Sequence, residues 1–180
     1  MNLKYILPFI SIILLFSCKS SIQDEVTVYK LPRPPKQNTI IALIAYTTDQ
    51  NNIPLSLIVK MKGEMAPNIK ELKNEFELFC NTLKWNEDGI LNYTKPETWQ
   101  EKNIESNSII ERLLSFSASD SNGDVMDVSV FRGAGGTEEE NVNRWRNQIG
   151  LKDASKQEIL NNKETINLPH LGQGSLFVLR

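Results

Sequence analysis

Apolar residues recur along the chain with two periodicities, one typical of strands and one typical of helices, which together predict a protein of mixed secondary structure. Residues 40–46 form an unbroken apolar run rich in β-branched side chains, and residues 55–61 alternate in part. Turn-forming residues separate these segments, so we expect two strands joined as a hairpin. Residues 109–118 and 125–131 predict a second hairpin, because an Asn-Gly pair stands in the turn between them.

Two segments have the spacing of amphipathic helices. Apolar side chains recur every three or four positions between residues 66 and 84, and Cys80 is one of them, which predicts a helix and a buried, inert thiol. Residues 138–149 predict a second helix, since Thr137 and the Glu three positions later form a capping-box pattern and Gly150 marks the end. Its buried stripe is expected to consist of Val142, Trp145 and Ile149.

Shorter elements complete the pattern. Ser155 and Glu158 form another capping-box pair, which predicts a short helix through about residue 162. The order of all these segments predicts one α+β domain over residues 39–180, with a mostly antiparallel sheet packed by two main helices. Further elements are expected at residues 90–94 (a strand), 96–99 (a loop that returns Trp99 to the core) and 175–179 (a strand).

The first 17 residues have the character of an export signal. Lys4 lies in a short cationic start, and residues 6–16 form an apolar run that is too short to span a bilayer as a helix. The next residues, LFSC at 15–18, resemble the lipobox of bacterial lipoproteins, in which the Cys is acylated and becomes the mature N-terminus. An ordinary cleavage site is the alternative, but it usually needs a small residue where Leu15 stands. We therefore expect lipidation of Cys18.

Residues 18–38 are expected to form the lipidated N-terminus and a tether. Three prolines, Pro32, Pro34 and Pro35, favour an extended spacer that holds the domain off the membrane, although such a segment also resembles a ligand for proline-reading modules. Lys19 after the Cys resembles lipoproteins that are passed on to the outer membrane. The expected location is therefore the cell envelope, lipid-anchored at the outer membrane, with the periplasmic or surface face left open.

Composition excludes several classes of function. A net charge of −2 offers no basic surface for nucleic acid. With Cys18 lipidated, Cys80 is the only thiol, so no intramolecular disulfide is expected. The chain has one His and no Cys or His pair at metal-ligand spacing, so we expect neither a metal nor a cofactor.

Two candidates for catalytic or phosphate chemistry fail on physical grounds. The Gly-rich residues 133–136 precede a helix, where phosphate can bind, but three Glu at 138–140 would repel the anion and the Lys-Ser/Thr of a phosphate loop is missing. These glycines are expected to serve a backbone turn. His170 lies in an expected loop, and no G-x-S-x-G motif accompanies it. We expect no catalytic residue.

The most distinctive segment is the helix that contains Arg-Trp-Arg. With Trp145 facing inward, Arg144 and Gln148 are expected to share one flank of the helix. Asn143 and Arg146 are expected to lie to either side of the buried stripe. One interpretation is a polar groove beside the indole that binds a carboxylate or a sugar. The other is a structural network of Arg stems and guanidinium groups, which we favour because such groups commonly pair with loop carbonyls and carboxylates. The candidate residues for binding or for the network are Asn143, Arg144, Trp145, Arg146 and Gln148.

This segment also carries a family resemblance. Residues 131–136 read FRGAGG and residues 141–151 read NVNRWRNQIGL. They resemble an uncharacterised bacterial envelope lipoprotein family whose members carry a Gly-rich turn and an N-x-N-R-W-R-x-Q helix. The family is similar in look to PsbP/Mog1-like α+β domains, which implies a fold and no activity. The resemblance extends to residues 96–99, 112–116 and 168–172.

Residues 59–63 and 76–79 are similar to the closing strand and helix of that family, which there follow the Arg-Trp-Arg helix and here precede it. The chain is either a circularly permuted domain or half of one repeat joined to half of another. The leading functional hypothesis is a non-catalytic accessory or interaction domain with an envelope protein partner, which predicts an exposed apolar patch and no deep polar pocket. The alternative is a small-ligand binding protein that uses the Arg-Trp-Arg helix, and a hydrolase is a weaker third hypothesis.

Overall fold

The uninterrupted apolar run of the first strand is explained by burial on both of its faces. Strand β1 (Gln37–Thr48) is buried from Thr39 to Ala45. Ile41 and Leu43 belong to the core on one face of the sheet, and Ile40 and Ile44 belong to the core on the other. The computed structural model describes residues 35–180, apart from 49–53, 66–68, 105–110, 122 and 134–135.

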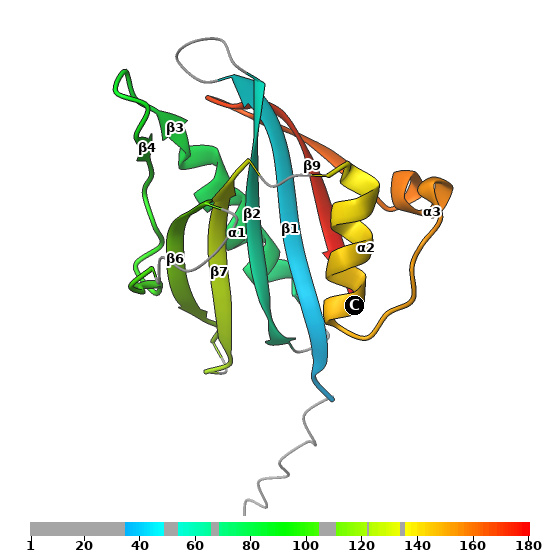
Figure 1. The fold of residues 1–180 in the computed structure, drawn as a ribbon. Coiled ribbons are helices and arrows are strands. Elements are labelled where there is room, and N and C mark those ends of the chain that lie inside the picture. Colours follow the sequence, from blue (N-terminus) through cyan, green and yellow to red (C-terminus); the bar gives the residue numbers. More distant parts are fainter. Residues whose placement is uncertain (1–34, 49–53, 66–68, 105–110, 122, 134–135) are drawn as a thin grey trace, which may run out of the picture. The chain divides into compact units, whose positions relative to one another are not determined.

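The main sheet has the strand order β5-β6-β7-β2-β1-β9-β8, and all its paired strands are antiparallel (Figure 1). Both predicted hairpins are present, as β1–β2 and β6–β7. Strands β3 (Lys84–Trp85) and β4 (Leu91–Asn92) form a separate two-stranded ribbon. The other strands are β2 (Pro54–Met65), β5 (Gln100–Glu101), β6 (Glu111–Ser119), β7 (Val125–Arg132), β8 (Glu164–Leu168) and β9 (Gly172–Leu179).

Helices cover the two faces of this sheet unequally. Helix α1 (Lys70–Thr82) packs on one face through Leu72, Phe76 and Phe79, and Cys80 is fully buried beside them. Helices α2 (Glu138–Gln148) and α3 (Lys156–Asn161) pack on the other face, over β1 and β9 (Figure 1). The α2 face of β6 and β7 is not covered by any helix of the described residues (Figure 1).

The larger core contains an aromatic cluster that ties the loops to the sheet. Trp99 is 1% exposed, and its ring centroid lies 4.8 Å from that of Phe79 and 5.7 Å from that of Phe116. Tyr93 contacts the same Phe116 ring edge-on at 5.5 Å. The prediction that residues 96–99 return an aromatic side chain to the core is therefore confirmed.

The expected α+β class is confirmed: a single domain with a mostly antiparallel seven-stranded sheet and three helices. The sequence missed β8, because its side chains are mostly exposed and an edge strand needs no apolar alternation. The first helix spans Lys70–Thr82 rather than residues 66–84, because Lys84 pairs in a ribbon. The signal, Cys18 and most of the tether lie outside the described residues. Within those residues, no helix is both long enough and apolar enough to cross a membrane.

Candidate functional site

The Gly-rich turn positions the start of α2. Gly133 and Gly136 have φ of +64° and +98°, a backbone region that other residues rarely adopt. The Glu140 carboxylate accepts from the Thr137 backbone N–H at 2.7 Å, and the Glu140 N–H donates to Thr137 Oγ1 at 3.2 Å. The expected capping box is therefore present. The Glu140 carboxylate already accepts the hydrogen bond of a backbone N–H that a phosphate at this helix end would need.

The inner side of α2 anchors the helix to the sheet. Val142 and Trp145 are 1% and 4% exposed and join the smaller core with Ile44, Ile58 and Phe177. Ile149 is half-buried against the same core. Trp145 is thus mainly a packing residue, and its neighbours on either side project along the two flanks of the helix.

Asn143 and Arg146 hold the segment between α2 and α3. Asn143 Nδ2 donates to the Ala154 carbonyl at 3.1 Å, and Asn143 Oδ1 accepts from the Ala154 N–H at 2.8 Å. Arg146 Nε donates to the Lys152 carbonyl at 2.7 Å. Both side chains therefore bind backbone groups of residues 152–154, although helical spacing had placed them on opposite sides of the buried stripe.

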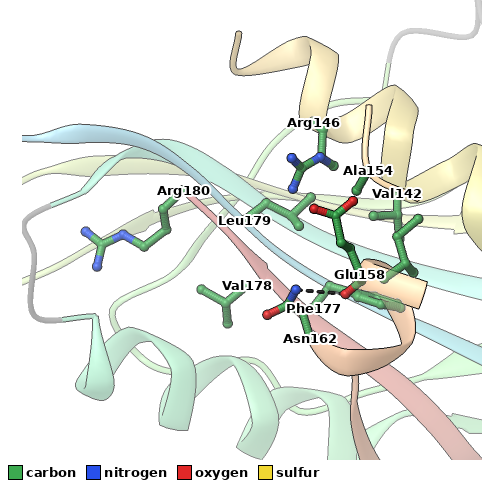
Figure 2. Close-up of a pocket in the computed structure, with 10 residues that line it drawn as sticks. Val142, Arg146, Ala154, Glu158, Asn162, Phe177, Val178, Leu179 and Arg180 are labelled. Atoms are coloured by element: carbon green, nitrogen blue, oxygen red, sulfur yellow. Dashed lines mark hydrogen bonds between the residues drawn. The ribbon is translucent and has the colours of Figure 1, made fainter. Parts of the chain in front are cut away.

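A hollow of about 320 Å³ opens between this flank, α3 and the end of β9. Figure 2 shows Arg146 and Glu158 facing each other across its mouth, above Phe177 and Leu179. The pKa of Glu158 is lowered by hydrogen bonds from the Ser155 backbone and hydroxyl, and further by the nearby charge of Arg146. Arg146 donates to the Lys152 carbonyl and Glu158 accepts from Ser155, so both side chains are already bonded within the α2–α3 connection.

Arg144 and Gln148 lie on the other flank, as expected, and line a groove between α2 and strands β2 and β7. We call it the Lys60 groove; its volume is about 230 Å³. Lys60 Nζ donates to Gln148 Oε1 at 3.2 Å, which joins the strand to the helix across it. The groove is lined by Ile58, Lys60, Phe131, Asn141, Arg144, Trp145 and Gln148.

Positive charge concentrates around this groove. Burial lowers the pKa of Lys60, and the like charges of Lys62, Arg112 and Arg144 lower it further, while Asp127 opposes them. The Phe131 ring lies beneath two of these cations, with Lys60 Nζ at 5.9 Å and the Arg112 guanidinium at 5.2 Å from its centroid. These contacts hold the cations over an apolar surface.

Asn141 lines the same groove and is almost completely buried. Its side chain is 3% exposed, and Nδ2 donates to the Thr137 carbonyl at 3.0 Å. This bond fixes which end of the amide is the donor, so Oδ1 is the acceptor. Oδ1 is buried and has no hydrogen-bond partner among the described residues.

The five residues singled out from the sequence have three different roles in the structure. Asn143 and Arg146 brace a connection, Trp145 packs in the core, and Arg144 and Gln148 line the Lys60 groove. Three further residues of the groove were not predicted from the sequence: Lys60 and Phe131 from the sheet, and Asn141 from the helix. Lys60 and Lys62 interrupt the apolar pattern of β2 at the two positions that follow Ile58 on its face, a signal that could have indicated an uncovered part of the sheet.

His170 and Cys80 lie in the turn and on the buried helix face where their sequence patterns placed them. His170 is exposed in the turn between β8 and β9. Burial, and secondarily the charge of Glu77, raises the pKa of the Cys80 thiol well above its ordinary value. In the described part of the chain, no group of three or more His, Cys, Asp or Glu side chains could hold a metal ion.

Exposed apolar side chains are spread over the described domain. They belong to separate segments, so the expected interaction patch stays a prediction. The large ones are Tyr46, Leu78, Ile90, Ile104, Val125 and Leu160.

Comparison with known proteins finds no matching family model, no matching curated protein and no matching solved structure. The resemblance to an envelope lipoprotein family, and the permutation inferred from it, therefore stay predictions.

Proposed function

We propose that this chain is a membrane-anchored cell-envelope lipoprotein whose domain is a non-catalytic interaction or accessory module. The observation that carries the proposal is the LFSC segment at residues 15–18, directly after an apolar run too short to span a bilayer. Acylation of Cys18 would attach the mature protein, since two or more acyl chains hold stably where one holds only marginally.

The entry of the chain into the sheet supports the proposed arrangement. Lys36 forms an ion pair with Asp124, a residue 8% exposed at the start of β7, and β1 begins at Gln37. Residues 19–36 therefore separate the proposed anchor from the sheet. A stretch of this length spans at most about 60 Å when fully extended. The sheet would thus begin no further than about 60 Å from the proposed anchor.

The test compares the two cysteines. Cys18→Ala should abolish incorporation of labelled fatty acid and release the protein from the membrane fraction. Cys80→Ala is the matched control and should stay acylated and membrane-bound, because its side chain is buried in the α1 core. A Cys18→Ala protein that is still acylated and membrane-bound would overturn the proposal.

A second candidate function, small-ligand binding, is favoured by the Lys60 groove, because Arg144, Trp145 and Gln148 line it together. Ligand binding stabilises the folded state and so raises the melting temperature. A screen of small carboxylates and sugars should therefore shift the melting temperature of the wild type and not of Arg144→Ala. If no compound shifts the wild type, this second function is dismissed and the lipoprotein proposal is unaffected.

A further inference from the structure

Strand β9 is paired over different lengths on its two sides. Strand β1 pairs with it from Gly174 to Leu179, whereas β8 pairs with it only from Gly172 to Leu176. Within the described residues, positions 177–179 therefore have a neighbouring strand on one side only, and we call them the β9 edge. Residues of an antiparallel strand direct their backbone N–H and C=O groups to alternate sides. At least one residue of the β9 edge therefore points both groups away from β1.

The hollow of about 320 Å³ between α2, α3 and β9 runs along this edge. Phe177, Val178 and Leu179 all line it. Side chains of a strand point to alternate faces of the sheet, so three consecutive residues can border one space only where it meets the side of the strand. Figure 2 shows Val178 and Leu179 on opposite sides of β9, with Asn162 beside the strand. The open backbone and the hollow therefore belong to one site.

The inner lining of the hollow is apolar. Val142, Ile159 and Phe177 are at most 4% exposed. Arg146 and Glu158 at the mouth are opposite in charge, and both are bonded within the α2–α3 connection. The mouth therefore favours neither a cation nor an anion. A ligand would gain apolar contact in the hollow and hydrogen bonds along the β9 edge.

An extended peptide is the ligand that suits both features. Paired with the β9 edge, its backbone would bond the outward N–H and C=O groups, and one of its side chains would point into the hollow. A helix uses its backbone groups internally and cannot pair in this way. The volume of about 320 Å³ is at the lower end of the range for ligand pockets, which suits one large apolar side chain.

The β9 edge also lacks the protection that open sheet edges usually have. Natural proteins keep exposed edges from pairing by means of charges, prolines or very short strands. The two outermost strands of this sheet follow that rule, because β5 has two residues and β8 begins with the exposed Glu164. Phe177, Val178 and Leu179 include neither a charge nor a proline. This part of the sheet is therefore suited to accept a further strand.

We propose that the β9 edge docks an extended, uncharged segment of a partner protein by strand addition, with one apolar side chain of that segment in the hollow. The inference rests on the proposed interaction function and names the surface and the kind of partner. The added segment would lie in line with β8, whose first residue, Glu164, pairs with Leu176.

The probe is a phage-displayed library of random heptapeptides, selected on the full-length chain purified in detergent from whole cells. The recovered peptides should share an apolar residue between neighbours that favour strands. As synthetic peptides they should bind the chain in calorimetric titration. Recovery of no binding peptide would overturn the inference, and so would a set without a common apolar position.

Two matched variants assign the site. Asn162→Trp places a large side chain in the hollow from an exposed position, and it should weaken binding of the selected peptides about tenfold or more. Asn161→Trp is the control, since this exposed neighbour is not among the residues that line the hollow, and binding should stay within about twofold. Circular dichroism verifies that both variants are folded. Equal binding by the two variants would place the peptides elsewhere and overturn the inference.

Methylation of the peptide backbone distinguishes strand addition from side-chain docking, and it needs no protein variant. Every second amide of the peptide should face β9, so N-methylation at those positions should weaken binding about tenfold or more. At the alternate positions, binding should stay within about twofold. A peptide that tolerates methylation at every position would contradict the proposed pairing.

A second copy of the chain is the competing occupant. If the chain alone forms a dimer that Asn162→Trp dissociates and Asn161→Trp does not, the edge pairs with another copy and the proposed partner is wrong. Failure of peptide binding leaves the lipid anchor untouched, because the Cys18→Ala experiment decides it separately. Conversely, a Cys18→Ala protein that stays acylated leaves the peptide measurements valid.

Discussion

Asn143 pairs with both backbone polar groups of Ala154, eleven positions further along the chain. Its amide donates to the carbonyl at 3.1 Å and accepts from the N–H at 2.8 Å. One side chain therefore makes the two hydrogen bonds that a neighbouring strand would otherwise make. Ala154 is itself 7% exposed in the smaller core, which makes water a poor substitute for the asparagine.

Asn143→Ala should lower the free energy of unfolding by about 1–3 kcal/mol, because the N–H and the carbonyl of Ala154 lose their partner. Urea unfolding followed by circular dichroism measures the change. Asn147→Ala on the same helix is the control. It removes only an exposed contact with Asp153, and a loss within about 0.5 kcal/mol is expected. Equal losses would show that Asn143 does not support the connection.

Gly136→Ala should destabilise the start of α2. The residue has φ of +98°, and a Cβ there would lie 2.9 Å from Glu140 Oε2, within the capping box. A loss of about 1–3 kcal/mol is expected in urea unfolding, from backbone strain together with the displaced carboxylate. Gly133→Ala separates the two causes, because its φ is +64° and, apart from its chain neighbours, no atom of the described residues lies within 4 Å of the added Cβ. The loss there should be the smaller.

Lys60→Met should raise the free energy of unfolding at pH 7 by up to about 1 kcal/mol. Burial and neighbouring cations lower the pKa of Lys60. The unfolded chain then holds this proton more tightly, so the stability of the wild type relative to Lys60→Met should rise as pH increases through the folded pKa. A difference independent of pH between 7 and 11 would contradict this account.

Asp127 should contribute to stability at neutral pH and lose that contribution in acid. Burial by itself would raise the pKa of Asp127, but hydrogen bonds from Lys102 and Ser129 outweigh it and lower the pKa. A lowered carboxyl pKa gives stability that is present above the unfolded value of about 4 and disappears as pH falls through the folded value. Because both side chains of this pair are about half-exposed, the free energy of unfolding of the wild type should exceed that of Asp127→Asn by less than about 1 kcal/mol at pH 7. The difference should vanish by about pH 2.

Cys80 should be inert in the folded protein. Its thiol is fully buried and its pKa is raised, so little thiolate forms and the reagent has no access. In the Cys18→Ala background, Cys80 is the only thiol. A thiol-specific chromogenic reagent should then label the protein in urea at the rate of unfolding, and should label it very slowly without urea. Rapid labelling without denaturant would show that the α1 core opens readily.

Much of the fold was predictable because local physics decides it. The capping boxes at Thr137 and Ser155 are satisfied within one turn, and both helices begin where the pattern places them. In the turn before β7, Gly123 likewise has the positive φ that its place in an Asn-Gly pair predicts. Edge strand β8 was missed because its pairing with β9, rather than its own sequence, makes it a strand.

In the candidate site, too, some features follow from the local sequence and others depend on tertiary packing. The sequence by itself determined that Trp145 faces inward and that Arg144 and Gln148 share a flank, because helical periodicity decides both. It could not show that Lys60 lies opposite Gln148, 88 positions away, since that approach depends on how the sheet and α2 pack. The fold thus creates the groove and its concentration of charge, whereas the proposed anchor at Cys18 rests on adjacent residues alone.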